Sequence, residues 1–260
     1  MHPHTVQALL ALNRRFYEHF ATDFARTRRT WPPGFSLILP HLESASNVLD
    51  LGCGNGRLLA FLGQQGWQGR YAGIDSSAEL LAEADFVARR HPDIAASFAR
   101  EDLFGVTWAR AARAAGAPDA IVSLAVLHHI PGRANRVSFL AQCAGLLAPH
   151  ARLILSTWQF MTSERLRRRT LSWNTLSIDM SDLEKDDYLV GWGEGGAGVR
   201  YCAFIDSEAL LAVAQEAGLA LSKGQIFEAF FGAALKAAPS LGANFPAWAS
   251  SLSPSIQVPS

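Results

Sequence analysis

The segment Asn47-Val-Leu-Asp-Leu-Gly-Cys-Gly-Asn-Gly-Arg57 constrains the fold more than any other part of the chain. An apolar run that leads into closely spaced glycines is typical of a buried strand that turns sharply into a helix. The backbone N–H groups at the start of such a helix point into the crevice beyond the strand. The segment therefore predicts the floor of a site for a cofactor that contains a nucleoside.

Acidic residues near this turn indicate which cofactor it takes. Asp75 ends a second strand-like run about 20 residues past the turn, the spacing of a carboxylate that binds ribose hydroxyls. A dinucleotide-binding turn has the pattern GxGxxG, whereas this one has GxGxG followed by Arg57. Asp50 would repel a pyrophosphate but suits a cofactor with an ammonium group and a sulfonium. These features favour S-adenosylmethionine over NAD.

Composition limits the classes of protein. The chain has 260 residues, 49% of them hydrophobic, which is enough for one large α/β core. Lys+Arg and Asp+Glu both number 23, so any surface that attracts nucleic acid must be local. Arg165-Leu-Arg-Arg-Arg169 is such a run, and it is either a phosphate contact or a solvated helix face.

The three cysteines, Cys53, Cys143 and Cys202, form no CxxC pair, so neither a disulfide framework nor a metal site is expected. The apolar runs fall short of the ~18 residues that a membrane span needs. We therefore expect a soluble, cytoplasmic protein with no membrane contact and no metal.

Strand-like and helix-like patterns alternate through the first two thirds of the chain, which predicts an α/β fold with a doubly wound parallel sheet. The strand-like runs are Asn47–Leu51, Tyr71–Ile74, Ile94–Phe98, Ala120–Leu124 and Arg152–Ser156. Helical patterns cover Val6–Phe24, Gly56–Gln65, Ser77–Arg90, Trp108–Ala115 and Arg133–Leu147, with Ser76 or Ser77 as an N-cap.

The pattern changes after Trp158, where a polar stretch with several tryptophans extends to about Arg200. A helix over Ser207–Ala217 follows, and then two runs, Leu219–Ile226 and Glu228–Ala234, close enough in sequence to pair antiparallel. We expect an N-terminal helical cap (1–45), a cofactor-binding domain (46–238) with an insertion (158–204), and a tail (239–260).

The motifs that follow successive strands are shared with a known family. With Asp50-Leu-Gly-Cys-Gly-Asn-Gly56, Asp75, Glu101-Asp102-Leu103 and Leu127-His128-His129, the chain resembles class I S-adenosylmethionine-dependent methyltransferases from about Asn47 to Ile226. The resemblance implies a Rossmann-like, seven-stranded, mostly parallel sheet with an antiparallel last strand. It also implies that Asp102 binds the adenine amino group beside Leu103, and that Gly52 and Gly54 leave room for the methionine end. Ser76 and Ala125 complete the cofactor contacts that we expect on the strand ends.

A narrower resemblance involves three other motifs. Thr27-Arg28-Arg29-Thr30-Trp31-Pro32, Asp187-Tyr-Leu-Val-Gly-Trp192 and Arg200-Tyr201 look like the tRNA wobble-uridine methyltransferases, which methylate the carboxylate of 5-carboxymethyluridine. The resemblance implies a tRNA acceptor and an activator subunit of the kind that eukaryotic relatives need. Gly191 replaces a usual proline, and Cys202-Ala203 replaces a usual aromatic-histidine pair. Small-molecule O- or N-methylation and a non-enzymatic, cofactor-binding regulatory protein are the alternatives.

The acceptor decides which residues take part in the chemistry. A carboxylate is ionised at neutral pH and needs no base, whereas a hydroxyl or amine needs one. His128 and His129 form the one obvious base cluster, and they serve either as a base or as packing around the cofactor. By resemblance, Arg28 would pair with the methionine carboxylate, and Arg200 and Tyr201 would hold the acceptor. The alternatives are that Arg28 belongs to a solvated charged face and that Arg200 and Tyr201 belong to the core of the insertion.

Overall fold

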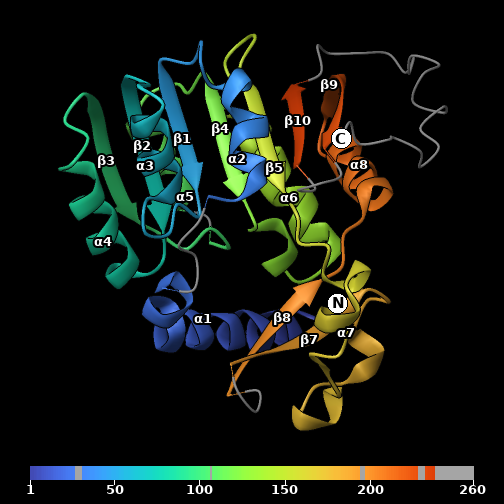
Figure 1. Cartoon of the computed structure of the whole chain (residues 1–260). Helices are drawn as coiled ribbons and strands as arrows, with labels where there is room; N and C mark the ends of the chain where they lie inside the picture. Colours follow the sequence, from blue (N-terminus) through green and yellow to red (C-terminus); the bar gives the residue numbers. More distant parts are fainter. Residues whose placement is uncertain (27–30, 106, 194–196, 228–231, 238–260) are drawn as a thin grey trace.

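Five parallel strands form the centre of the main sheet, in the places where the sequence predicted strands. A computed structural model describes residues 1–26, 31–105, 107–193, 197–227 and 232–237. The strands are β1 (Asn47–Leu51), β2 (Gly69–Asp75), β3 (Ile94–Arg100), β4 (Ala120–Leu124) and β5 (Arg152–Ser156). Their order across the sheet is β3-β2-β1-β4-β5, and their carboxyl ends point toward the N-terminal helix in Figure 1.

Two further strands complete the sheet beyond β5. These are β9 (Leu219–Phe227) and β10 (Gly232–Ala237), and β10 lies antiparallel to both β5 and β9. The seven-stranded order β3-β2-β1-β4-β5-β10-β9 confirms the predicted sheet with an antiparallel last strand. The described part of the last strand is Gly232–Ala237, and the predicted start, Glu228, lies outside the described residues.

Helices cover both faces of this sheet. One face packs against α2 (Pro33–Ile38), α3 (Arg57–Gln64) and α4 (Ala78–Ala88), and the other against α5 (Trp108–Ala114), α6 (Arg133–Ala144) and α8 (Ser207–Glu216). Strand β1 shows why: Val48 packs in the cluster that contains Leu59 of α3, whereas Leu49 packs in the cluster that contains Leu140 of α6. Because side chains alternate along a strand, a strand that is buried along its whole length, as β1 is, requires cover on both faces.

A second, smaller sheet occupies the predicted insertion. Its antiparallel strands are β6 (Thr170–Leu171), β7 (Asp187–Trp192) and β8 (Gly198–Ala203). The short elements around it are η3 (Phe160–Thr162), α7 (Glu164–Arg167), η4 (Trp173–Thr175) and η5 (Met180–Asp182). The sequence did not predict this sheet, because β7 contains an aspartate and a glycine, which strands disfavour. Here the Tyr201 hydroxyl of β8 donates a 2.6 Å hydrogen bond to the buried Asp187 carboxylate.

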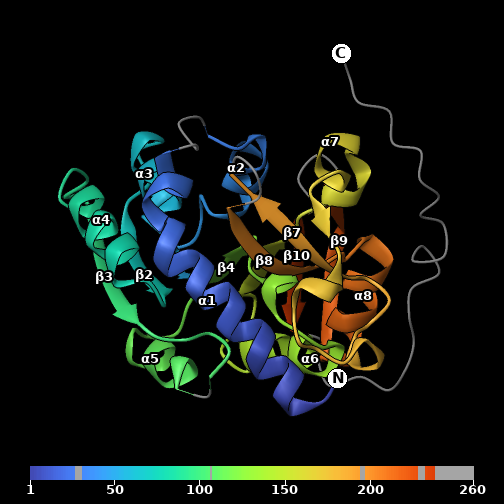
Figure 2. The same cartoon turned by 90° about the horizontal axis from the view of Figure 1, so that it is seen from below.

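Helix α1 (Pro3–Arg26) runs across the carboxyl ends of the central strands, beside the small sheet (Figures 1 and 2). It packs closely on β8, because a Cβ atom at Gly198 would lie 2.7 Å from the Phe16 ring. Asn13 binds both backbone polar groups of Tyr201: its Oδ1 accepts from the N–H at 2.7 Å and its Nδ2 donates to the carbonyl at 3.2 Å. Helix α1 therefore holds the small sheet against the main one.

Three further expectations concern membrane helices, the cysteines and the C-terminal tail. In the described ranges, no helix has both the length and the apolar character that crossing a bilayer requires. The three cysteines are free and buried. The tail from residue 239 onward lies outside the described residues.

Candidate cofactor and acceptor site

A cavity of about 550 Å³ lies where α1 crosses the carboxyl ends of the strands. Sites that enclose small molecules usually have volumes of roughly 300–1,000 Å³. Eleven of the thirteen predicted site residues line it, namely Asp50, Gly52, Gly54, Asp75, Ser76, Asp102, Leu103, Ala125, His128, His129 and Arg200. Arg28 lies outside the described residues, and the Tyr201 ring does not line the cavity. The three predicted carboxylates thus share one hollow.

Asp50 is a buried carboxylate in the floor of this cavity. Its Oδ2 accepts a short hydrogen bond from the hydroxyl of Tyr71, which is also buried. Burial is the main reason that the pKa of Asp50 is raised to about 7; the Tyr71 hydrogen bond opposes this shift, and the charge of Asp75 adds to it. An acid in this condition is stabilised in its ionised form by a positive charge nearby. Asp50 thus suits a cationic ligand.

Asp75 stands at the end of β2 with both oxygens oriented by the backbone. Its Oδ2 accepts from the Gly54 N–H and its Oδ1 from the Ser77 N–H, each at 2.9 Å. Each carboxylate oxygen can accept more than one hydrogen bond, so lone pairs remain for ligand hydroxyls. Ser77, rather than Ser76, caps α4 by accepting from the Leu80 N–H, which leaves Ser76 in the cavity wall.

The three glycines of the turn have different structural roles. Gly52 has a φ of +78°, and a Cβ there would lie 2.4 Å from a Val126 methyl carbon. Gly56 allows α3 to pack on α4, because its Cβ would lie 3.1 Å from the Ala84 backbone. At Gly54 a Cβ would meet no atom within 4 Å, so the space in front of this residue is open. That opening, next to Asp50 and Asp75, fits a ligand that approaches the backbone closely.

Asp102 follows β3 and forms a bond to the N-terminal helix. Its Oδ2 lies 2.9 Å from the Arg14 guanidinium of α1, and its Oδ1 accepts from the Phe104 N–H at 2.9 Å. Both charged side chains are well exposed, and such ion pairs contribute about 0–1 kcal/mol. A ligand can therefore share Asp102 with Arg14 at little cost.

Ala125 places the two histidines in the cavity. Its φ is +60°, a left-handed conformation that costs a residue with a side chain roughly 1–2 kcal/mol. Ser156 of β5 holds this turn, because its Oγ and its carbonyl oxygen both accept from the Ala125 N–H, at 3.0 and 3.1 Å. The chain then enters the short helix η2 (Leu127–His129).

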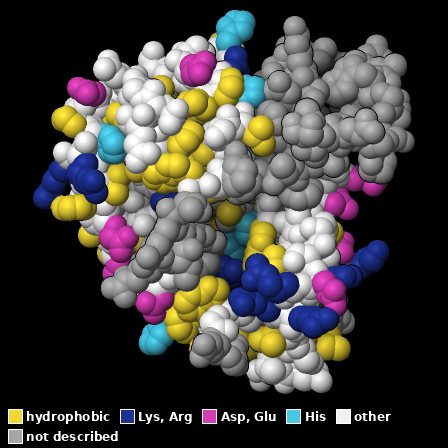
Figure 3. Space-filling model, viewed as in Figure 1, with side chains coloured by type: hydrophobic (Ala, Val, Ile, Leu, Met, Phe, Trp, Pro, Cys, Tyr) yellow, Lys and Arg dark blue, Asp and Glu magenta, His cyan; other side chains and the backbone are white. Residues whose placement is uncertain are grey.

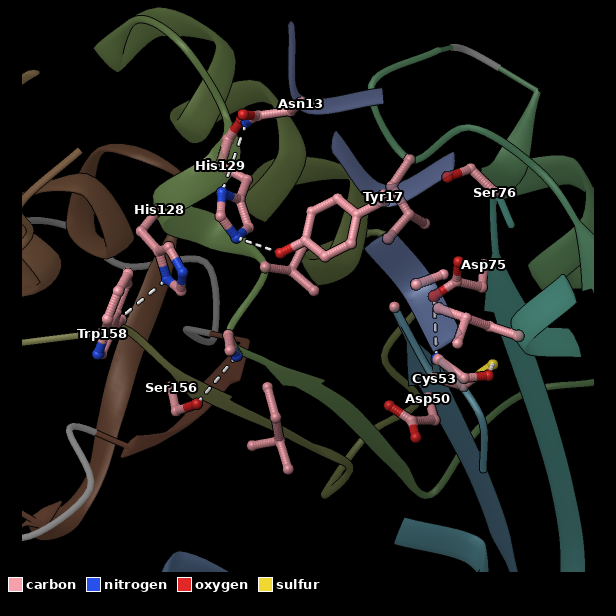
Figure 4. Close-up of a pocket in the computed structure, with 18 of the residues that line it drawn as sticks. Asn13, Tyr17, Asp50, Cys53, Asp75, Ser76, His128, His129, Ser156 and Trp158 are labelled. Atoms are coloured by element: carbon pink, nitrogen blue, oxygen red, sulfur yellow. Dashed lines mark hydrogen bonds between the residues drawn. The ribbon is translucent and has the colours of Figure 1, made fainter. Parts of the chain in front are cut away.

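The hydrogen bonds of His129 define its tautomer. Its Nδ1 lies 3.0 Å from the Tyr201 carbonyl oxygen, which can only accept, so Nδ1 carries the proton. Its Nε2 then accepts from the Tyr17 hydroxyl at 2.8 Å. His128 accepts at Nδ1 from the Trp158 N–H at 3.2 Å. In Figure 4 the two histidines lie on one side of the cavity and Asp50, Cys53 and Asp75 lie on the other. Tyr17 stands between these two groups.

Among the described residues, His128, His129 and Cys202 form the one cluster of side chains that could bind a metal ion, and their potential ligand atoms lie within 4.8 Å of one another. Both nitrogens of His129 take part in hydrogen bonds here, with the Tyr17 hydroxyl and the Tyr201 carbonyl oxygen. Burial also raises the pKa of the Cys202 thiol to about 12, which disfavours the thiolate that binds metals.

Arg200 is a buried cation in the cavity wall, on the histidine side. Its guanidinium carbon lies 4.7 Å from the centre of the Trp158 ring and 5.0 Å from that of Phe16. Two aromatic faces stabilise the charge and hold the guanidinium in place. Only 5% of the residue is exposed, so an anion that binds it must lose its hydrating water.

Tyr201 has a different place from the one that the sequence predicted. Its ring is fully buried and its hydroxyl donates to Asp187, whereas its backbone binds Asn13 and His129. Tyr188 packs edge-on against Phe160 and likewise does not line the cavity. Tyr201 is therefore placed to support Arg200 and His129 rather than to contact an acceptor.

Helix α1 supplies site residues that the sequence analysis missed. These are Leu10, Asn13, Arg14, Tyr17 and Ala21, all in the cavity wall. A signal for them existed, because they recur at intervals of three and four along one helix face. Asn13, Arg14 and Tyr17 place polar groups on the same face as apolar Leu10 and Ala21, which indicates a role beyond packing.

Comparisons with known proteins agree with this geometry. Among solved structures, an S-adenosylmethionine-dependent methyltransferase from Clostridium acetobutylicum superposes with a TM-score of 0.59 at 14% identity, covering 87% of this chain and 99% of that one. A complex titled DhpI-SAH superposes with a TM-score of 0.57 at 18% identity, covering 89% and 98%. The fold is thus that of S-adenosylmethionine-dependent methyltransferases. Residues 23–223 match the family model of a methyltransferase domain, and the chain belongs to this family.

Curated relatives differ in their acceptors. A tRNA (carboxymethyluridine(34)-5-O)-methyltransferase of Macaca fascicularis is 30% identical over 145 residues, which are 55% of this chain and 19% of that protein. A trans-aconitate 2-methyltransferase of Azoarcus is 37% identical over 98 residues, or 36% of this chain and 33% of that protein. The chain thus matches less than half the length of each. The family favours an enzyme over the regulatory protein considered above.

Proposed function

We propose that this methyltransferase takes its methyl group from S-adenosylmethionine and transfers it to a carboxylate oxygen of the acceptor. The observation that carries the proposal is the position of Arg200, a buried cation between two aromatic rings in the wall of the cavity that Asp50 and Asp75 also line. One end of the cavity thus suits a cation and a ribose, and the other suits an anion.

The chain's residues fit the cofactor along the strand ends. Asp75 is placed to bind ribose hydroxyls, Asp102 and Leu103 to border the adenine, and Gly54 to leave room for the methionine end. S-adenosylmethionine supplies a methyl group attached to a positively charged sulfur. The buried Asp50 carboxylate favours that charge at the floor of the site.

The acceptor half needs to orient an anion rather than to remove a proton. A carboxylate with a pKa near ~4 is already ionised at neutral pH. The Arg200 guanidinium can hold it by two parallel hydrogen bonds, and alignment with the methyl group supplies the acceleration. Trp158 and Phe16 exclude water from this contact and keep the guanidinium in one plane.

The names of two relatives support this acceptor class, since carboxymethyluridine and trans-aconitate both carry a carboxylate. A modified wobble uridine of tRNA is our first candidate, and a small carboxylic acid is the alternative. An activator subunit and a cytoplasmic location remain parts of this proposal.

The test is to incubate the protein with methyl-labelled S-adenosylmethionine and either tRNA that bears 5-carboxymethyluridine or trans-aconitate. A carboxylate methyl ester releases its label as methanol in mild alkali, whereas methyl ethers and N-methyl groups do not. We expect alkali-labile label, and Arg200→Gln should raise the KM for the acceptor without changing cofactor affinity. Arg200→Lys, which keeps the charge but not the planar fork, should give an intermediate KM. Label that resists alkali would overturn the proposal.

A second acceptor class is favoured by one observation, the hydrogen bond between Tyr17 and His129. If the acceptor were a hydroxyl, its proton could pass to the Tyr17 oxygen while the Tyr17 proton moves to Nε2 of His129. The resulting imidazolium would still donate from Nδ1 to the Tyr201 carbonyl. Small-molecule O-methylation is therefore the second candidate, and alkali-stable label would indicate it.

A further inference from the structure

Four arginines stand exposed on α7 and the turn that follows it: Arg165, Arg167, Arg168 and Arg169. Glu164 pairs with Arg168 one helical turn away. In a chain whose positive and negative residues both number 23, this segment is a local concentration of positive charge. Figure 3 shows Lys and Arg side chains gathered over this part of the molecule, below the hollow between the two sheets.

The position of α7 relative to the acceptor half of the cavity is fixed by apolar packing. Leu166 packs against the small cluster that contains Phe160. The Phe160 ring in turn lies 5.1 Å from Trp158, which lines the cavity and covers Arg200. The α7 arginines therefore stand on the outer side of the wall whose inner side faces the acceptor.

An RNA acceptor has the chemistry that this arrangement fits. A base that enters an enclosed site must leave its stack, and its flanking phosphates then stay outside at the entrance. Guanidinium groups match phosphate oxygens in geometry as well as in charge. Contacts of this kind set the position of the strand and do not read its sequence.

We propose that the α7 arginines bind the phosphate backbone of an RNA whose carboxylate-bearing base enters the cavity. The inference rests on the RNA form of the proposed function, and it adds the surface that selects RNA over a small carboxylic acid. The same chemistry in a small acceptor would need Arg200 but not α7.

The test compares two triple variants. Arg165→Gln/Arg167→Gln/Arg169→Gln removes three charges and retains the Arg168–Glu164 pair. The matched control is Arg89→Gln/Arg90→Gln/Arg110→Gln, which removes three exposed arginines beside the main sheet, two directly after α4 and one in α5. Total tRNA is the probe, titrated over a range of salt concentrations with S-adenosylhomocysteine present. Calorimetry of S-adenosylhomocysteine binding checks that each variant retains its cofactor site.

We expect the α7 variant to bind tRNA about tenfold or more weakly near physiological salt, with a slope of log K against log salt that is shallower by about 2. The control should match the wild type in both. Equal tRNA binding by all three proteins, or no tRNA binding by the wild type, would overturn the inference. The inference would also be overturned if the α7 variant lost binding to phosphatidylglycerol vesicles but bound tRNA as the wild type does. That result would assign the arginines to membrane binding.

This outcome is separable from that of the proposed function, because tRNA binding is measured without turnover. If the α7 variant loses tRNA binding but no alkali-labile label enters RNA in the wild type, the surface stands and the RNA form of the proposed reaction fails. If label enters RNA equally well in both proteins, with the same KM for tRNA, the reaction stands and the surface fails.

Discussion

The Tyr17 hydroxyl lies 2.8 Å from Nε2 of His129, so the first helix of the chain completes the hydrogen bonding of a histidine that follows the fourth strand. Tyr17→Phe removes this donor and keeps the ring. With a carboxylate acceptor, we expect kcat to change little, because no proton needs to leave. With a hydroxyl acceptor, kcat should fall about a hundredfold or more, as when a general base is lost.

Rates in single-turnover experiments, with cofactor bound, separate these cases. His129→Ala is the companion variant. If it weakens cofactor binding while the transfer rate in the bound complex is unchanged, the base role is excluded and packing is the function of His129.

The buried carboxylate of Asp50 predicts a pH dependence of stability. Its pKa in the folded protein is raised to about 7 from 3.8, chiefly by burial. Between these values the folded state holds a proton that the unfolded state has lost, so the free energy of unfolding falls as pH rises, by up to about 1.4 kcal/mol per pH unit. Urea denaturation at pH 5 and pH 8 should show a smaller loss of stability in Asp50→Asn. An identical loss in both proteins would contradict the prediction.

The same residue predicts a difference between the charged cofactor and its product. S-adenosylmethionine carries a sulfonium that S-adenosylhomocysteine lacks, so ionised Asp50 favours the former. We expect wild-type affinity for S-adenosylmethionine to rise as pH increases through 7, with a weaker trend for S-adenosylhomocysteine. Asp50→Asn should reduce this difference in trend. Calorimetric titrations at pH 6, 7 and 8 provide the measurement.

Two glycines of the turn should respond differently to alanine. Gly52→Ala places a methyl group against Val126 in a left-handed conformation, and we expect a stability loss of about 1–3 kcal/mol or more. Gly54→Ala meets no protein atom, so its cost to stability should be limited to backbone strain. Its methyl group would instead occupy ligand space and weaken cofactor binding. Thermal unfolding paired with calorimetry tests both; equal effects on stability would show that the Val126 contact is relieved.

Asn13 predicts a structural effect at the acceptor end. Asn13→Ala leaves the Tyr201 backbone N–H and carbonyl without this partner in a buried place, for an expected loss of at least about 2 kcal/mol. Arg14→Ala is the neighbouring control, because it removes only an exposed ion pair. We also expect Asn13→Ala to raise the KM for the acceptor, since β8 carries Arg200. Comparable unfolding free energies for the two variants would show that the Asn13–Tyr201 hydrogen bonds do not stabilise the fold.

Local sequence patterns predicted the main sheet because they coincide with its burial. The strands β1, β4 and β5 begin and end at the predicted residues, since each is an apolar run bounded by turn residues. The turn glycines and the acids at strand ends were likewise visible, because parallel strands bring their carboxyl ends to one edge.

The small sheet was not predicted, because long-range contacts maintain it. Asp187 is tolerated in β7 through the Tyr201 hydroxyl, and β8 needs a glycine at position 198 because Phe16 and Phe20 of α1 lie against it. The stacking of Arg200 between Phe16 and Trp158 joins three segments that are far apart in sequence. A pattern within one segment carries no information about such a contact.

The family model begins at residue 23, whereas Leu10, Asn13, Arg14 and Tyr17 already line the cavity. A fragment that starts at residue 23 would lack one wall of its binding site. It would also lack the two hydrogen bonds that join Asn13 to the Tyr201 backbone of β8. Weak ligand binding by such a fragment would reflect the missing helix rather than the properties of the enzyme. A purification tag is better separated from Pro3 by a spacer, so that the helix can still seat itself across the strand ends.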